Sequence, residues 1–354
     1  MRVRGWFLTG IGVVGLLGGC DFSSEGGGGG SPDGGGGGDG GGGGERADAA
    51  PCAQVKVDLA PVTPTVMLLV DRSGSMTDPF GAEPSRWDAL YGTLMDATTG
   101  VVKQLEGSVR FGVATYTARD RDNDGQVEGA CPRMNTVAPA LDNYLAIEDV
   151  YGALAPLDET PTGAAIESVL PTLTAVAAAG PKILVLATDG EPDTCARPNP
   201  NGHAQARIDA LLAVQAAFEA HVRTYVVSVG GEAVGNPQAE RHMHELANAG
   251  LGRAPDADPG APLYVALEPE ELVAAFDDII GGVRTCTFEL EGTVDEEHAA
   301  GGTVTLDGDE LDYGTDWQLL DGSTLELLGS ACDAVLAGGE HTVEAYFTCE
   351  AIVD

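Results

Sequence analysis

A short run of apolar residues that ends abruptly in a polar loop constrains this chain more than any other feature. Residues 66–70 are all apolar, with Pro64 before them and a Ser-Gly turn shortly after them. Such a run, bounded by turn signals, is typical of a strand buried on both faces of a sheet. The sequence therefore predicts a strand that delivers Asp71 into a loop at its carboxyl end.

The loop after this strand carries oxygen-bearing side chains at alternate positions. Asp71, Ser73 and Ser75 can all turn toward one hard cation if the backbone curls, and Gly74 permits a tight curl. This Asp-x-Ser-x-Ser pattern resembles the metal-ion-dependent adhesion site of the von Willebrand factor A domain family.

The resemblance extends to two later loops. The family completes its site with a Thr in a second loop and an Asp in a third, both at the carboxyl ends of sheet strands. Thr160 opens the matching stretch 160–165, and Asp189 follows the apolar run 184–187. By resemblance, the expected metal ligands are Asp71, Ser73, Ser75, Thr160 and Asp189.

The resemblance also implies how such a site works. The expected ion is Mg²⁺, with Mn²⁺ or Ca²⁺ as alternatives. It takes the two Ser and the Thr directly, and the two Asp residues directly or through water. One coordination position stays open, and in the family a carboxylate of a partner protein fills it.

Acidic residues beside these loops depart from the family pattern. Asp158 and Glu159 stand where the family usually has Gly, and they add negative charge beside the site. Glu191 and Asp193 follow Asp189 and act in the same direction. We expect Glu191 and Asp193 to lie in a solvated loop.

The amino terminus predicts export and lipid anchoring. Residues 1–20 combine two Arg residues, an apolar stretch over 6–17 and small residues, as an export signal does. The stretch is too short and too often interrupted by Gly to be a spanning helix. Residues 17–20 look like a bacterial lipobox, which makes Cys20 the lipidated membrane anchor. The alternative is an ordinary cleaved signal with an incidental Cys.

Composition divides the rest of the chain. Residues 21–50 are dominated by Gly and have too few apolar side chains to offset the entropy of ordering, so we expect a disordered tether. As a random coil, it has a typical reach of roughly 30 Å. The remainder suffices for a large domain over residues 51–283 and a smaller one over 284–354.

The large domain alternates strands with helices. Strands are expected over 66–70, 109–117, 184–189, 222–229 and 263–267, with a short edge strand near Thr136. Ser85 is expected to cap one helix and Pro269 to open the last one. Such alternation predicts an α/β fold, a doubly wound and mostly parallel sheet with helices on both faces.

The pattern changes after residue 284 to short alternating runs punctuated by Gly and Asp. They predict a small β-rich domain with one helical turn near Cys332. The expected strands are 287–290, 303–306, 317–320, 325–328 and 342–347.

Cysteine usage fits an exported chain. The sequence has seven cysteines, and setting Cys20 aside leaves an even number. Sequence alone allows many connectivities, which the expected topology narrows because domain termini often lie close together. The favoured pairs are Cys52–Cys286, Cys131–Cys195 and Cys332–Cys349. No close Cys pair has the spacing of a zinc site.

The charge balance restricts the partners. The net charge of −37 excludes a nucleic-acid role. Solubility or salt adaptation is the favoured explanation of this acidity. A second calcium site is the more specific alternative. A possible calcium loop uses Asp120, Asp122, Asp124 and Glu128, although Cys131 occupies the position where a bidentate Glu is expected.

Motifs for catalysis are weak. His242, His244 and Glu245 suggest a zinc protease, but the second His of that motif would stand at Asn248. We expect His242 and His244 at the surface. There is no Gly-x-Ser-x-Gly motif, and no base lies near Ser73 in the sequence. We therefore expect no enzymatic activity.

These features together predict a lipoprotein of the bacterial cell envelope that binds an acidic residue of a protein partner through a metal ion. The lipid on Cys20 is its only expected membrane contact. The outer membrane or cell surface is favoured over the inner membrane. The alternatives are an envelope metal-dependent enzyme or enzyme subunit, and a tethered structural scaffold. The ligand and the role of the small domain stay open.

Overall fold

A computed structural model describes residues 54–57, 59–61, 63–122, 124–178, 180–230, 236–336, 341–348 and 350–353. The chain divides into two units, residues 1–54 and 55–354, and the described residues lie almost entirely in the second. The predicted signal, the tether, Cys20, Cys52 and Cys349 lie outside the described residues. No helix within the described ranges is long and apolar enough to cross a membrane.

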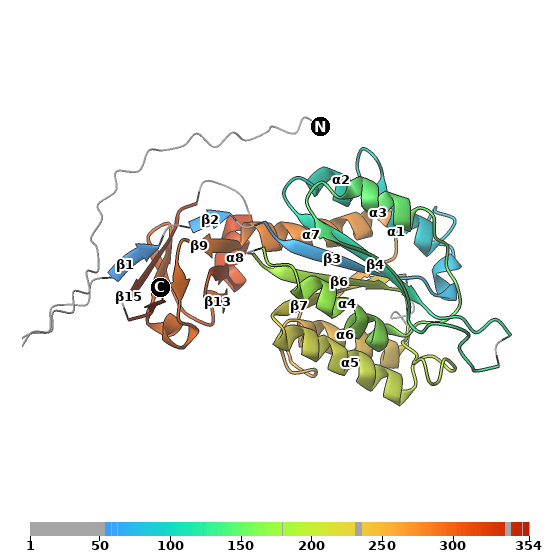
Figure 1. Ribbon diagram of the computed structural model, residues 1–354. Coiled ribbons are helices and arrows are strands. Elements are labelled where there is room, and N and C mark those ends of the chain that lie inside the picture. Colours follow the sequence, from blue (N-terminus) through green and yellow to red (C-terminus); the bar gives the residue numbers. More distant parts are fainter. Residues whose placement is uncertain are drawn as a thin grey trace, which may run out of the picture. The chain divides into compact units, whose positions relative to one another are not determined.

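The larger domain is built on a six-stranded, mostly parallel sheet (Figure 1). Its order is β5 (Arg133–Ala140), β4 (Arg110–Thr117), β3 (Thr65–Asp71), β6 (Lys182–Thr188), β7 (Val222–Val229) and β8 (Tyr264–Ala266). Only the edge strand β5 runs antiparallel to its neighbour. The predicted doubly wound sheet and its edge strand near Thr136 are confirmed.

The order in which the chain adds strands reverses at β3, which pairs with β4 on one side and with β6 on the other. The chain fills the β4 side first and then returns to build outward from β6. Ligands of open α/β sheets bind beyond the carboxyl ends of the strands at such a switch point. Asp71 ends β3 and Asp189 directly follows β6, so both predicted acidic ligands stand there.

Helices cover both faces of the sheet (Figure 1). One face packs against α1 (Arg86–Met95), α2 (Val101–Leu105), α3 (Tyr144–Tyr151) and α7 (Pro269–Thr285). The other packs against α4 (Thr162–Thr174), α5 (Ala204–Glu219) and α6 (Pro237–Gly250). Alternate residues of β3 enter opposite cores: Val66 and Leu68 face one, Met67 and Leu69 the other. This explains the unbroken apolar run, because both faces of the strand are buried.

Local signals set the helix starts. Ser85 Oγ accepts a hydrogen bond from Asp88 N at 3.0 Å and caps α1. Pro269 opens α7, where Glu268 and Glu271 form a capping box. The helical pattern after Ser85 is broken ahead of Gly100, so α1 and α2 are separate helices.

The carboxyl-terminal region is β-rich, as predicted. One sheet has the order β1 (Gln54–Val57), β15 (Val343–Thr348), β11 (Thr303–Leu306) and β12 (Asp309–Leu311). A second has the order β13 (Trp317–Asp321), β14 (Thr324–Leu327), β9 (Thr287–Leu290) and β2 (Leu59–Pro61). β10 (Thr293–Val294) pairs with β16 (Ile352–Val353). A separate core surrounds Trp317, Leu325 and Phe347.

Strand β2 precedes the large domain in sequence but pairs with a strand that follows it. Leu59 stands opposite Leu290 and Pro61 opposite Phe288 in an antiparallel ladder with β9. The α/β domain therefore lies between two pieces of the β-rich region. This differs from the expected division at residues 51 and 284, because three residues of strand carry too little pattern to reveal their partner.

Two disulfides lie within the described residues. Cys131 joins Cys195, as predicted, with the two Cα atoms 5.6 Å apart. Cys286 joins Cys332, so the predicted pairs Cys52–Cys286 and Cys332–Cys349 are wrong. Cys286 directly follows α7 and Cys332 lies in α8 (Gly329–Leu336). Cys286 and Cys332 are close enough to pair because α7 contacts α8 of the β-rich region.

Candidate metal centre

Asp71 anchors the candidate site and is fully buried at the end of β3. Its Oδ1 accepts a hydrogen bond from Ser73 N at 2.8 Å, and its Oδ2 accepts one from Thr188 Oγ1 at 2.6 Å. The chain then curls into the short 3₁₀ helix Gly74–Thr77. This curl turns the Ser73 and Ser75 side chains back toward the end of the strand.

Two serine hydroxyls connect the β3 loop to the end of β6. Ser73 Oγ and Ser75 Oγ lie 3.1 Å apart, and Ser75 Oγ donates to Asp189 Oδ1 at 2.9 Å. Hydrogen bonds therefore link Asp71, Ser73, Ser75 and Asp189 in one chain of contacts. The structure brings these four predicted ligands together from segments far apart in sequence.

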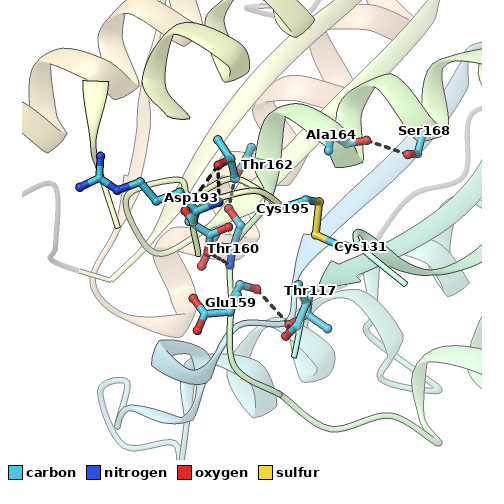
Figure 2. Close-up of a disulfide and its surroundings, with 12 residues drawn as sticks. Thr117, Cys131, Glu159, Thr160, Thr162, Ala164, Ser168, Asp193 and Cys195 are labelled. Atoms are coloured by element: carbon cyan, nitrogen blue, oxygen red, sulfur yellow. Dashed lines mark hydrogen bonds between the residues drawn. A yellow bond between two sulfur atoms is a disulfide. The ribbon is translucent and has the colours of Figure 1, made fainter. Parts of the chain in front are cut away.

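Thr160 lies in a loop whose backbone contacts the loop after β3. Gly74 N donates to Asp158 O at 3.1 Å, which places this loop against the β3 loop. Thr160 is buried, and Figure 2 shows it beside Glu159 and Asp193. The described hydrogen bonds of Thr160 run through its main chain to Thr162 and Asp193, and none of them joins it directly to the other four residues.

The structure places Asp193 in the interior, so the expectation of a solvated loop was wrong for it. Asp193 is only 2 % exposed, its Oδ2 accepts from Thr160 N, and its N donates to Thr160 O at 3.0 Å (Figure 2). Asp193 lies two residues before Cys195. The residue thus connects the disulfide-bridged loop to the Thr160 loop.

Glu191 is also buried, contrary to the expectation. Its carboxylate pairs with the Arg207 guanidinium through two hydrogen bonds, including Arg207 Nε to Glu191 Oε2 at 2.7 Å. This contact fastens the loop after β6 to α5. The acidic side chains around the site are therefore part of its framework.

Burial and mutual repulsion shape the charges of the two carboxylates. Burial, and after it the charge of the nearby Asp189 carboxylate, raise the pKa of Asp71 to about 7. Burial also raises the pKa of Asp189, while the Arg86 guanidinium opposes this effect. Two buried carboxylates beside neutral hydroxyls form an all-oxygen donor set, which suits a hard divalent cation. The residues present therefore fit the implied metal ion.

Arg86 is a charged group of the site that we did not predict. Its Nη1 lies 2.5 Å from Asp189 Oδ2 and 3.2 Å from Ser75 O. The sequence offered one signal: Arg86 is the first residue of α1, where the helix dipole disfavours a cation. This position alone does not identify Asp189 as its partner.

The predicted calcium loop is only partly assembled. Oxygens of Asp120, Asp122 and Asp124 lie within 4.8 Å of one another. Glu128 instead accepts a hydrogen bond from Arg121 N at 3.0 Å, outside that group. Both carboxylate oxygens of Asp120 accept hydrogen bonds from backbone N–H groups of the same loop, those of Asp124 and Gly125.

The two His residues of α6 differ from each other. His244 is exposed as expected, but His242 is only 1 % exposed, so the surface prediction was wrong for it. Neither ring nitrogen of His242 has a hydrogen-bond partner among the described residues. Burial lowers its pKa to about 4.

Comparison with known proteins adds a family and several similar folds. The sequence model of the von Willebrand factor type A domain matches residues 65–254. No curated protein matches the chain. The pilus adhesin SpaC from Lactobacillus rhamnosus GG is 14% identical over 80% of this chain and 39% of its own length, with a TM-score of 0.45.

Two further solved structures show similar folds. The PilB minor pilin from Streptococcus sanguinis is 16% identical over 64% of this chain and 62% of its own length, with a TM-score of 0.44. The manganese-loaded TRAP protein of Plasmodium vivax is 15% identical over 83% of this chain and 97% of its own length, with a TM-score of 0.41. The chain thus spans less than two thirds of SpaC and of PilB.

Proposed function

Because this chain belongs to the von Willebrand factor type A domain family, we propose that it binds an acidic group of a partner protein through a divalent metal ion. The proposed ligands are Asp71, Ser73, Ser75, Thr160 and Asp189. Mg²⁺ is the proposed ion, with Mn²⁺ and Ca²⁺ as alternatives. The proposal assigns no catalytic step.

The observation that carries this proposal is the chain of contacts at the switch point of the sheet. Asp71, Ser73, Ser75 and Asp189 converge there although Asp71 ends β3 and Asp189 follows β6. When bound, a divalent ion would supply an electropositive position for the carboxylate of a partner.

The surrounding residues hold the donors in place for such an ion. Thr188 and the Ser73 N–H fix the two oxygens of Asp71, so its carboxylate cannot rotate freely. Asp193 holds the main chain at Thr160 through two hydrogen bonds. A site whose donors are already oriented loses little conformational entropy when an ion binds.

We further propose that Cys20 anchors the protein in the outer membrane or at the cell surface through a lipid, with residues 21–50 as a tether. The support is the lipobox-like sequence and the Gly-rich composition. Metabolic labelling with a fatty-acid analogue would incorporate lipid into the protein, and a Cys20→Ser variant would lose the label. Labelling that persists in Cys20→Ser would overturn the lipid anchor.

The metal site is tested by calorimetric titration of the full-length protein with MgCl₂, MnCl₂ and CaCl₂. We expect one ion per chain at this site in the parent protein and loss of that binding in Asp71→Asn. Asp277→Asn is the matched control, because Asp277 is an exposed acid of α7 and its replacement removes the same charge. Unchanged binding in Asp71→Asn would overturn the assignment.

Partner recognition is tested with two short immobilised peptides that are identical except at one position, where one peptide has Glu and the other has Gln. We expect Mg²⁺-dependent binding to the Glu peptide, and its loss on addition of a chelator or in Asp71→Asn. Equal binding to both peptides in Mg²⁺ and in chelator would overturn recognition of a carboxylate through the metal.

A further inference from the structure

The Arg86 guanidinium occupies a position inside the candidate metal site. Its Nη1 contacts Asp189 Oδ2 at 2.5 Å, Ser75 O at 3.2 Å and Asp78 Oδ2 at 3.4 Å. Asp189 has a fully buried side chain, whereas the side chain of Asp78 is 56 % exposed. The attraction to Asp189 is therefore the stronger one, since water screens the contact with Asp78.

The fold leaves a defined space for this side chain. Only 11 % of the Arg86 side chain is exposed. Gly230 adopts a φ of +99°, and a Cβ at that position would lie 2.5 Å from Arg86 Nε. The glycine backbone directly after β7 therefore accommodates Arg86 in this position, and a larger residue there would require the Arg86 side chain to shift.

The hydrogen bonding of the guanidinium is incomplete. Arg86 Nε is buried and has no hydrogen-bond partner among the described residues. An unsatisfied buried donor costs free energy, so hydrogen bonding alone does not explain this position. The charge of Asp189 does, because an uncompensated buried carboxylate would cost more.

Groups of the protein itself contact both oxygens of Asp189. Oδ1 accepts from Ser75 Oγ and Oδ2 accepts from Arg86 Nη1. When both carboxyl groups are ionised, Asp71 and Asp189 carry two negative charges, and the guanidinium offsets one of them. A divalent cation close to this guanidinium would be repelled by it in a setting of low dielectric constant.

We propose that Arg86 is a resident cation that competes with the divalent ion for Asp189. It neutralises Asp189 while the metal is absent, and it lowers the affinity of the site for the metal. This inference rests on the proposed metal-binding function and adds a residue that tunes the same site. The opposing role, in which Arg86 only orients Asp189 for the metal, has the opposite consequence for affinity.

Calorimetry distinguishes these roles in the full-length protein titrated with MgCl₂. Removing a unit charge several ångströms from the ion has an expected effect of about tenfold or more. We therefore expect Arg86→Gln to bind Mg²⁺ at least about tenfold more tightly than the parent protein. Arg86→Lys keeps the charge, and we expect it to bind close to the parent affinity.

Lys103→Gln is the matched control for net charge. Lys103 lies on α2, with a side chain that is 43 % exposed and paired with Glu106. Its replacement removes one positive charge away from the site, and we expect no change in Mg²⁺ affinity. A similar gain of affinity in Lys103→Gln would overturn a specific role for Arg86.

Thermal unfolding in a chelator gives a readout without metal. Arg86→Gln leaves Asp189 buried and unpaired, so we expect a lower Tm than the parent protein. Addition of Mg²⁺ should raise the Tm of Arg86→Gln more than that of the parent, because tighter binding stabilises more. An equal Mg²⁺-induced rise in both proteins would overturn the competition.

A measurement on the parent protein covers the case in which Arg86→Gln does not fold. The side-chain N–H resonances of Arg86, assigned by comparison with Arg86→Lys, should shift as MgCl₂ saturates the site. Resonances that do not change on saturation would overturn the proposal.

The outcomes separate this inference from the proposed function. Mg²⁺ binding by the parent with equal or weaker binding by Arg86→Gln overturns the competition and leaves the metal site intact. Absence of binding in the parent and in all variants overturns both. Binding by Arg86→Gln alone supports the competition and overturns metal binding as the function of the native chain.

Discussion

Thr188 Oγ1 donates a hydrogen bond to Asp71 Oδ2 at 2.6 Å, across the boundary between two neighbouring parallel strands. Both residues are buried. Thr188→Val keeps the shape but removes this hydrogen bond to a buried carboxyl group. We expect a loss of about 2 kcal/mol in the free energy of unfolding, measured by urea denaturation in chelator.

Thr115→Val is the matched control for that experiment. Thr115 is a buried threonine of β4, and its Oγ1 has no hydrogen-bond partner among the described residues. Replacing an unsatisfied hydroxyl with a methyl group should leave the stability unchanged or raise it. A larger loss in Thr115→Val than in Thr188→Val would contradict the importance of the Asp71 contact.

The Cys131–Cys195 disulfide should stabilise both the fold and the metal site. Its two cysteines are 64 residues apart, and closing a loop of that length contributes about 4 kcal/mol in the chain-entropy description. We expect replacement of both cysteines by Ser to lower the unfolding free energy by up to that amount. Mg²⁺ affinity should fall several-fold, because Asp193 would lose its neighbouring anchor. Urea denaturation and calorimetry measure the two effects.

The Cys286–Cys332 disulfide provides the comparison. Its separation of 46 residues predicts a similar loss of stability, about 4 kcal/mol, on double replacement by Ser. It joins α7 to α8 and contacts none of the proposed metal ligands, so Mg²⁺ affinity should stay unchanged. Equal losses of affinity in both double variants would contradict the assignment of Cys131–Cys195 to the site.

His242 should make the protein less stable in mild acid. Burial lowers its pKa from 6.5 to about 4, so between these values the unfolded chain binds more protons than the folded one. Stability therefore falls as the pH decreases through this range, by up to about 3 kcal/mol in total. His242→Gln should lack this component when unfolding is measured from pH 7 to pH 4.

The difference between the parent and His242→Gln is the quantity to measure, because other groups titrate in the same range. The raised pKa values of Asp71 and Asp193 act with the opposite sign. Glu245 Oε2 lies 3.9 Å from His242 Nδ1, and Glu191 and Arg207 also act on the ring. His244→Gln, at an exposed position, should follow the parent curve.

Arg223 and Glu326 should behave as a coupled pair. Two hydrogen bonds join the guanidinium on β7 to the carboxylate on β14, and both side chains are largely buried. Arg223→Met leaves Glu326 as an unpaired buried charge, so we expect a loss of about 4 kcal/mol. The double variant with Glu326→Met should recover much of it. A double-mutant cycle in urea measures the coupling, and additive losses would contradict it.

The parts of the site that could be predicted are those fixed by strand direction. Asp71 and Asp189 each follow an apolar run, and parallel strands bring their carboxyl ends to one edge of the sheet. Ser73 and Ser75 could be predicted as ligands because Gly74 permits a tight curl that turns both side chains toward Asp71. The small β-rich region was predictable from its alternation, since a strand with one buried face alternates at period two.

The parts that could not be predicted depend on packing between distant segments. Arg86 looks like a solvent-facing charge at a helix start until the fold places it beside Asp189. The sequence around Asp193 predicts a solvated loop, yet Asp193 is buried and accepts a hydrogen bond from Thr160 N. Cys286 pairs with Cys332 because α7 meets α8, which no local pattern encodes.

The pairing of β2 with β9 places a ladder of hydrogen bonds ahead of the α/β domain along the chain. The segment ahead of β3 is held by the ladder in which Ala60 stands opposite Glu289. Tension applied from the amino-terminal side reaches this ladder before it reaches β3. The β2–β9 hydrogen bonds would therefore bear such tension ahead of the loop that follows Asp71.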